Sequence, residues 1–193
     1  LYFAAAGSGA MCRFYLKDPL LLALNVLPFV LFALLLLGLT GRAWLAFLLD
    51  GVVCLVYSWA AYWKWLGRSE PLYADDVAAI REAVQIGGRG YITVTWQIVA
   101  SLLLVAGGTL VLAWLARGRP RRRGRVATAC VALLLCVLGY FGVYRSNTLY
   151  DRFAVAPGRS AWSADDQFQS RGGIYPFLHS IRAAVPKAPD GYD

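Results

Sequence analysis

Four long apolar stretches, separated by charged residues, dominate the pattern of hydrophobic and polar positions. They run over 19–41, 43–63, 90–116 and 126–144, and Asp50 is the one acidic residue inside any of them. Each stretch reaches the roughly 20 residues that a helix needs to cross the hydrocarbon layer. A helix satisfies its own backbone hydrogen bonds in lipid, and the alternating strands of a membrane β-barrel are missing. The pattern therefore predicts an all-α integral membrane protein with four transmembrane helices.

The composition agrees with this prediction. Of the 193 residues, 59% are hydrophobic and 16% are charged, whereas a soluble domain has about 45–50% apolar and about 25% charged residues. A disordered chain is excluded because it needs low hydrophobicity. The formal net charge of +8 would by itself suggest nucleic-acid binding, so the position of the charges decides what they mean.

The basic residues are concentrated between the third and fourth apolar stretches. Residues 117–125 contain six arginines and no acid, and a short loop of this kind stays in the cytoplasm. The loop 64–90 has four basic and four acidic residues, and the segment 145–193 has six basic and five acidic ones. We therefore expect 117–125 to be cytoplasmic and the loop 64–90 and the C-terminus to be extracellular. The charge is then a topological signal, and no nucleic-acid partner is expected.

Four helices with an extracellular C-terminus also require an extracellular N-terminus. Arg13 and Lys17 are then on the outer side, against the usual tendency, and the only methionine is Met11. We interpret residues 1–18 as an outer leader, which is either a tag remnant before Met11 or the end of a missing helix. We favour the missing helix, so that the transmembrane domain 19–146 is a five-helix domain that lacks its first helix.

Two short amphipathic helices are predicted in the outer segments. In the loop 64–90, Asp75 can cap a helix with Asp76 in its first turn, and apolar residues then recur at helical spacing until two glycines. Residues 147–193 form an extracellular juxtamembrane segment and linker, which contains the second helix. Its apolar positions are Ile174, Phe177, Leu178 and Ile181. We expect both helices to lie on the outer leaflet.

Three residues interrupt the apolar stretches. A carboxylate such as Asp50 is costly in lipid unless it is paired, protonated or in a wet cavity, so it is a functional candidate. The more ordinary explanation is that it reaches the inner surface near Arg42. Pro28 frees a backbone carbonyl and bends its helix, and Asn25 can supply an interhelical hydrogen bond. For both of these residues we favour a packing role.

The cysteines and the single histidine have no metal-site spacing. The cysteines show neither CxxC nor His–Cys spacing, so no metal site or disulfide framework is predicted, and we interpret them as small packing residues. They are Cys12, Cys54, Cys130 and Cys136. His179 has no ligand residues near it in the sequence, and we expect it to contact solvent or lipid headgroups.

Three segments resemble the lipoteichoic acid synthase-like family. The run 64–76, KWLGRSEPLYADD, is similar to the outer loop of that family, which has a Lys, an Arg and a Pro-Leu before an Asp that opens a short helix. Asp18-Pro19 followed by Asn25 and Pro28 resembles the start of the family's second membrane helix. Trp162 and the run 173–178, GIYPFL, resemble the segment that leads into its extracellular domain.

The resemblance implies a fold and an activity for the whole protein. Members of this family have five membrane helices and an extracellular sulfatase-like domain that transfers phosphoglycerol from phosphatidylglycerol. That domain uses a catalytic Thr and a divalent metal, commonly manganese or magnesium. This chain then corresponds to the membrane domain without its first helix and without the catalytic domain. It has no catalytic residue and no cofactor of its own, and Mn or Mg is expected in the missing domain.

This correspondence gives a functional hypothesis. The membrane domain would anchor the catalytic domain in the bacterial cell membrane and present lipid to it during synthesis of anionic cell-envelope polymers. The expected partners are membrane lipids such as phosphatidylglycerol and the chain's own catalytic domain. Cations of the outer loop would bind the headgroup through charge-assisted hydrogen bonds, and its acids would balance them or dock the catalytic domain. The candidates are Lys64, Arg68, Glu70, Asp75, Asp76 and Arg81.

A different class of protein also fits the pattern. In a small non-enzymatic multi-pass subunit, either a transporter component or an assembly partner, Asp50 would be a coupling or partner-binding acid. A reading frame that continues past Asp193 favours the enzyme, and a stop codon there favours the subunit.

Overall fold

The computed structural model describes residues 19–68, 70–77, 96–116, 118, 122–146, 150 and 171–181. These residues are helical wherever they are regular, and four helices are long and apolar enough to cross a membrane. The four are α3 (Pro19–Thr40), α4 (Ala43–Arg68), α6 (Trp96–Leu115) and α7 (Arg122–Gly139), which continues as the π-helix η2 (Tyr140–Tyr144). The predicted multi-pass helical architecture is confirmed.

Two helix boundaries differ from the prediction. α4 continues to Arg68 instead of ending at Trp63, and α7 begins at Arg122 instead of Val126. Lysine and arginine are good helix formers, and their long stems can lie along apolar surface while the charge reaches water. A charged residue therefore marks the edge of the apolar stretch but not the end of the helix. Part of the predicted arginine loop is thus the first turn of α7.

Several predictions concern residues outside the described ranges. These are the leader 1–18, Arg81 with the rest of the outer-loop helix, Trp162, and the chain after 181. Within the loop, the structure describes the 3-10 helix η1 (Ala74–Val77). Within the last segment, it describes α10 (Ile174–Ser180). The origin from a five-helix domain and the outer-leaflet position of the amphipathic helices stay predictions.

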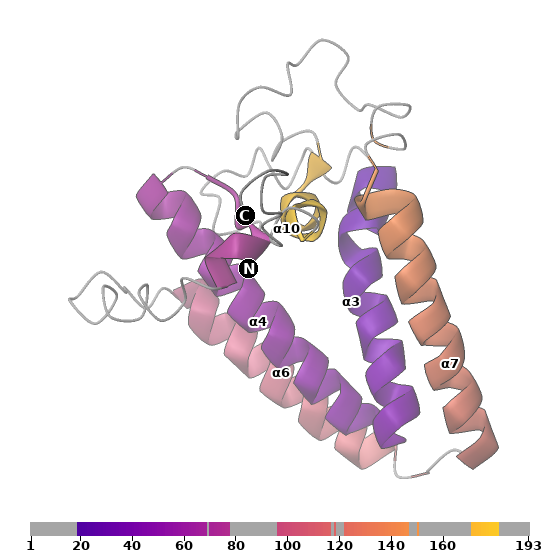
Figure 1. Ribbon diagram of the computed structural model, residues 1–193. Coiled ribbons are helices and arrows are strands. Elements are labelled where there is room, and N and C mark those ends of the chain that lie inside the picture. Colours follow the sequence, from indigo (N-terminus) through magenta and orange to yellow (C-terminus); the bar gives the residue numbers. More distant parts are fainter. Residues whose placement is uncertain are drawn as a thin grey trace, which may run out of the picture.

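The four long helices form two antiparallel pairs (Figure 1). α4 packs on α6 and α3 packs on α7, and α3 also contacts α4. The two pairs meet where Gly41 and Arg42 join α3 to α4, and they diverge toward the opposite end. α10 lies between them at that wide end.

Small residues let the helices of each pair approach closely. A Cβ atom on Gly38 of α3 would be 2.7 Å from Cα of Ala129 in α7. A Cβ on Gly51 of α4 would be 2.8 Å from Cγ1 of Val105 in α6. Membrane helices associate mainly through such close packing, because lipid is as apolar as their side chains.

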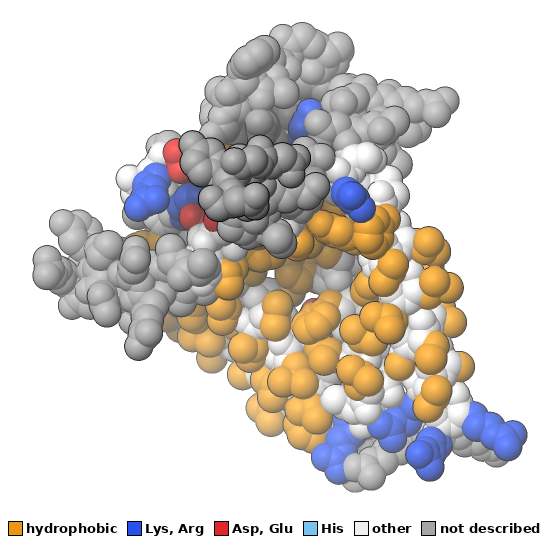
Figure 2. Space-filling model, in the orientation of Figure 1, with side chains coloured by type: hydrophobic (Ala, Val, Ile, Leu, Met, Phe, Trp, Pro, Cys, Tyr) orange, Lys and Arg blue, Asp and Glu red, His pale blue; other side chains and the backbone are white. Residues whose placement is uncertain are grey.

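The molecule has two distinct ends. We call the arginine end the one with Arg42, Arg122, Arg123 and Arg125, whose basic side chains lie beyond a largely apolar surface in Figure 2. We call the α10 end the opposite one, where α4 and η2 finish and where η1 and α10 lie. The loop after α4 and the segment 171–181 are therefore on the same side of the molecule. Which end faces the cytoplasm stays a prediction.

Candidate functional site

α10 fills the space between the diverging helix pairs at the α10 end. Ile174, Tyr175 and Pro176 are buried, and Tyr175 is only 1% exposed. Tyr175 packs in one apolar cluster with residues of α3 and η2 and against the ring of Tyr150, with ring centroids 4.3 Å apart. The helix is therefore inserted between the spanning helices and contributes to the core.

Tyr57 attaches α10 to α4. Its hydroxyl donates a hydrogen bond to the carbonyl of Gly173 at 2.7 Å. Its ring meets Phe29 of α3 edge-on at 6.0 Å and Phe177 of α10 at 5.4 Å between centroids. A tyrosine suits this position because its ring is apolar and its tip is polar. One side chain thus joins three elements.

Asn25 attaches α10 to α3. Its Nδ2 donates to the carbonyl of Leu21 at 2.8 Å, and its Oδ1 accepts from the backbone N–H of Ile174 at 3.3 Å. The first N–H groups of a helix have no partner within that helix, so Asn25 satisfies one of them from outside. Gly172, with φ of 82°, lies directly against the Asn25 amide, where a Cβ atom would collide. Glycine is required both for the positive φ and for the space.

Tyr144 links η2 to α3 through a carbonyl that Pro28 leaves without a partner. A proline has no N–H, so the carbonyl four residues before it, that of Leu24, loses its helical hydrogen bond. The hydroxyl of Tyr144 donates to this carbonyl at 2.6 Å. A carbonyl without a hydrogen bond costs roughly several kcal/mol in lipid, so the hydrogen bond from Tyr144 replaces a contact that the helix needs. The carbonyl that the sequence predicts to be free is therefore an interhelical contact.

His179, which belongs to α10, contacts the backbone of Tyr144. Its Nδ1 lies 2.9 Å from the carbonyl of Tyr144, and its ring stacks on that of Tyr175 at 5.0 Å. Because a carbonyl only accepts, this contact requires the proton on Nδ1. The expectation that His179 meets solvent or headgroups is thus wrong for Nδ1. Apolar spacing alone could not show that α10 packs between helix pairs.

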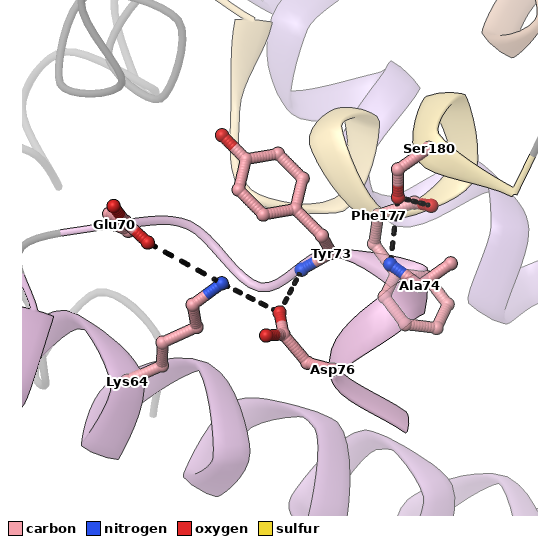
Figure 3. A network of polar contacts seen from close by, with 7 residues as sticks. All are labelled: Lys64, Glu70, Tyr73, Ala74, Asp76, Phe177 and Ser180. Carbon is pink, nitrogen blue, oxygen red and sulfur yellow. Dashed lines mark hydrogen bonds and ion pairs between the residues drawn. The ribbon is translucent and has the colours of Figure 1, made fainter. Parts of the chain in front are cut away.

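Lys64 lies at the centre of a charged cluster at the end of α4 that belongs to the α10 end (Figure 3). Its Nζ is 2.7 Å from Oδ2 of Asp76 and 3.9 Å from Oε2 of Glu70. Nζ also lies 4.5 Å from the centre of the Tyr73 ring. The side chain is only 11% exposed. The acids of the loop therefore compensate its charge.

Asp76 also fixes the backbone of the loop. Its Oδ2 accepts a hydrogen bond from the N–H of Tyr73 at 2.7 Å, the reach-back contact that the third residue of a helix makes in a capping box. The sequence predicts Asp75 as the residue before the helix, whereas Asp75 lies inside η1 and the capping contact comes from Asp76. Burial, and then the charges of Glu70 and Asp76, raise the pKa of the Tyr73 phenol.

The loop and α10 are joined directly. The N–H of Ala74 donates to Oγ of Ser180 at 2.7 Å, and that hydroxyl donates to the carbonyl of Phe177 at 2.9 Å (Figure 3). Each residue of this contact lies outside the four spanning helices. The position of α10 is therefore coupled to the cluster around Lys64 through a short turn of the loop.

The six outer-loop candidates occupy different environments. Lys64, Glu70 and Asp76 come together, whereas Arg68 and Asp75 are exposed, and no described side chain pairs with either of them. Arg81 lies outside the described residues. The sequence singles out neither Tyr57 nor Tyr144 as a candidate. The proline four residues after Leu24 was the one signal that could have pointed to Tyr144.

Asp50 lies inside the span of α4, two turns nearer the arginine end than Tyr57. Its Oδ2 is 4.0 Å from Sγ of Cys54, and its buried Oδ1 has no hydrogen-bond partner among the described residues. The described ranges contain no ion pair between Asp50 and Arg42. The contact with Cys54 is therefore the one polar contact of this carboxylate in the part of the chain that is described.

No family model, curated protein or solved structure matches the chain. In the described ranges, no three His, Cys, Asp or Glu side chains are grouped to hold a metal ion. That the chain needs no cofactor, and that Mn or Mg belongs to a further domain, stay predictions.

Proposed function

We propose that this chain is the membrane-anchoring and lipid-presenting domain of a lipoteichoic acid synthase-like phosphoglycerol transferase. In this proposal the arginine end faces the cytoplasm and the α10 end faces the outside of a bacterial cell. A helix precedes α3, and a sulfatase-like catalytic domain with Mn or Mg follows α10. The loop resemblance in 64–76 supports the family, and the attachment of α10 supports the anchoring role.

The attachment of α10 is the observation that carries the proposal. Hydrogen bonds join α10, or Gly173 directly before it, to α3, α4, η1 and η2. A domain that acts on lipid headgroups must be held at a constant height above the bilayer, because a small misplacement of the reacting groups is costly. A flexible linker alone would allow a wide range of heights. Because α10 is packed between the helix pairs, the domain that we propose to follow it would begin at a fixed position relative to the membrane helices.

Arg68 is the residue that we propose to meet the headgroup. Its guanidinium is exposed at the end of α4, and no described acid pairs with it. An arginine can bind a phosphate with two parallel hydrogen bonds. Lys64, one turn earlier, is engaged by Asp76 and Glu70 and orders the loop instead. Phosphatidylglycerol remains the proposed lipid.

The test uses the intact protein in vesicles that contain labelled phosphatidylglycerol, with Mn or Mg added. We expect transfer of labelled phosphoglycerol, and Arg68→Ala should raise KM about tenfold or more, since a hydrogen bond to a charged group contributes roughly 1.5–3 kcal/mol. Arg145→Ala, an exposed arginine at the same end, is the matched control and should leave KM unchanged. Absence of transfer would refute the enzyme, whereas an unchanged KM in Arg68→Ala would refute only the role of Arg68.

Asp50 favours a second candidate function. A carboxylate inside a span, with one oxygen lacking a partner among the described residues, suits a coupling or partner-binding acid of a non-enzymatic subunit. In that case Asp50→Asn should abolish assembly with the partner or transport, whereas Cys54→Ala on the same helix face should not. Wild-type behaviour of Asp50→Asn in both assays would remove this candidate.

A further inference from the structure

The meeting of the helix pairs brings together arginines that are distant in the sequence. Arg42 lies in the corner between α3 and α4, and Arg122, Arg123 and Arg125 lie on the first turn of α7. Figure 2 shows basic side chains gathered at this end, beyond the apolar surface. The acids that the structure describes are elsewhere. Asp50 lies within α4, and Glu70, Asp75 and Asp76 lie at the α10 end.

Arg125 is built into the corner. Its Nη2 donates to the carbonyl of Leu39 at 2.5 Å, one of the last carbonyls of α3, which have no partner within the helix. Gly41, with φ of 63°, lies against this side chain, and a Cβ there would be 2.7 Å from Cδ of Arg125. The Nε atom of Arg125 is buried and has no partner among the described residues. The positive charge at this corner is therefore fixed by the fold.

The neighbours of this surface are of the kind expected at the depth of lipid phosphates. The guanidinium of Arg42 lies 5.9 Å from the ring centre of Trp44, and Trp114, in the last turn of α6, is 68% exposed. Tryptophan marks the boundary between the hydrocarbon and the headgroups. Leu39 is 60% exposed beside the corner, as expected for a side chain in contact with lipid. An acidic protein would have to enter the headgroup layer to reach this surface, so these neighbours favour a lipid.

We propose that Arg42, Arg122, Arg123 and Arg125 form a binding surface for the phosphate groups of anionic phospholipids in the leaflet at the arginine end. The first turn of α7 contains no acid, so nothing in that turn offsets the mutual repulsion of its arginines. A lipid phosphate at this depth removes the repulsion and accepts charge-assisted hydrogen bonds. Arg122 and Arg123, which are exposed, make these bonds, and Arg125 holds the corner beside them. The surface serves an enzyme anchor and a non-enzymatic subunit alike, so it does not depend on the proposed activity.

The test is native mass spectrometry of the intact protein released from nanodiscs with equal amounts of phosphatidylglycerol and phosphatidylcholine. We expect the wild type to retain phosphatidylglycerol in excess. The ratio of the two retained lipids should fall about fivefold in Arg123→Gln and on the order of tenfold or more in the double variant Arg122→Gln, Arg123→Gln. Arg145→Gln, an equal loss of charge at the other end, should leave the ratio unchanged. The variant Arg122→Lys, Arg123→Lys keeps both charges and should retain most of the excess of phosphatidylglycerol.

Several results would overturn the proposal. Both lipids are offered to a protein that is already inserted, so arginines with a purely topological role predict a wild-type ratio near one. A ratio near one together with retention of an acidic protein would assign the surface to that partner. An equal fall in Arg145→Gln would show a nonspecific effect of net charge. Circular dichroism of each variant separates these outcomes from loss of the fold.

Discussion

At the α10 end the two helix pairs stand apart and an inserted helix fills the space, whereas at the arginine end the pairs meet at a short corner. Tyrosine hydroxyls, an asparagine amide and backbone groups hold the wide end together. Small residues allow the close contact within the α3–α7 pair nearer the corner, as Gly38 and Ala129 show. The comparison shows two ways to join membrane helices, one by polar contacts that satisfy freed backbone groups and one by close approach.

The charges at the two ends also differ, because only at the α10 end does a basic residue have acidic partners among the described residues. The cation Lys64 is engaged by Asp76 and Glu70, and this cluster orders the loop. The arginines at the other end have no described acid among them, although Arg125 bonds to a backbone carbonyl. Paired charges position the chain, and charges without an acidic partner are available to a ligand.

Gly172→Ala should have the largest effect on the α10 end. Alanine is disfavoured at a φ of 82°, and its Cβ would collide with Asn25. The expected loss is about 2–4 kcal/mol, from the left-handed backbone and from overpacking. We expect faster trypsin cleavage after the half-buried Arg171 and a lower unfolding midpoint. Gly107→Ala is the matched control because nothing lies within 4 Å of its added Cβ. An equal effect of both substitutions would contradict the seated position of α10.

Lys64→Met should be next in magnitude. The change removes the charge but keeps most of the stem, and it leaves Asp76 and Glu70 without their cation. For a partly buried pair we expect a loss of about 1–3 kcal/mol in the free energy of unfolding. Arg68→Met, the exposed cation one turn later, should change stability by less than about 0.5 kcal/mol. If the two variants behaved alike, Lys64 would not have an ordering role distinct from that of Arg68.

Much of the fold could be predicted from the sequence because lipid imposes a simple rule. A long apolar stretch has to be a helix there, and the described part of each of the four stretches contains a long helix. The start of α7 could not be predicted from charge, because Arg122 and Arg123 extend a helix as readily as they end it. Helix boundaries near charged residues depend on how far the side chain can reach toward water.

The candidate site was less predictable. The pairing of Lys64 with Asp76 joins α4 to a loop, and twelve positions of sequence separate the two residues. The contacts of Tyr57 and His179 depend on where α10 packs, and neither residue has a local pattern that reveals it. Pro28 is the exception, since its missing N–H predicts a free carbonyl at Leu24 without naming the donor.

Tyr144→Phe tests the polar contacts of the wide end with a smaller expected effect. The variant leaves the carbonyl of Leu24 without the donor that lies 2.6 Å away, and we expect a loss of about 1–2 kcal/mol. Pro28→Ala restores an N–H for the same carbonyl, so Tyr144→Phe should cost less in that background. A double-mutant cycle by chemical unfolding measures this coupling. Purely additive effects would mean that the hydroxyl does not replace the missing helical hydrogen bond.

The pKa of Tyr73 gives the smallest effect and tests whether the loop charges act on each other. Burial and the carboxylates of Glu70 and Asp76 raise this pKa above the ordinary value of about 10. The folded protein therefore holds the phenolic proton more tightly than the unfolded chain. This contribution to stability is complete below the ordinary pKa and is lost as the pH rises through the folded-state pKa.

The difference in phenolate absorbance between wild type and Tyr73→Phe reports the titration. Glu70→Gln should lower the pKa only partly, because burial is the larger cause and Asp76 remains. A return to the ordinary pKa in Glu70→Gln would mean that Tyr73 is more exposed to water than the packed loop allows. The wide end would then be held by α10 alone, without support from the charged cluster.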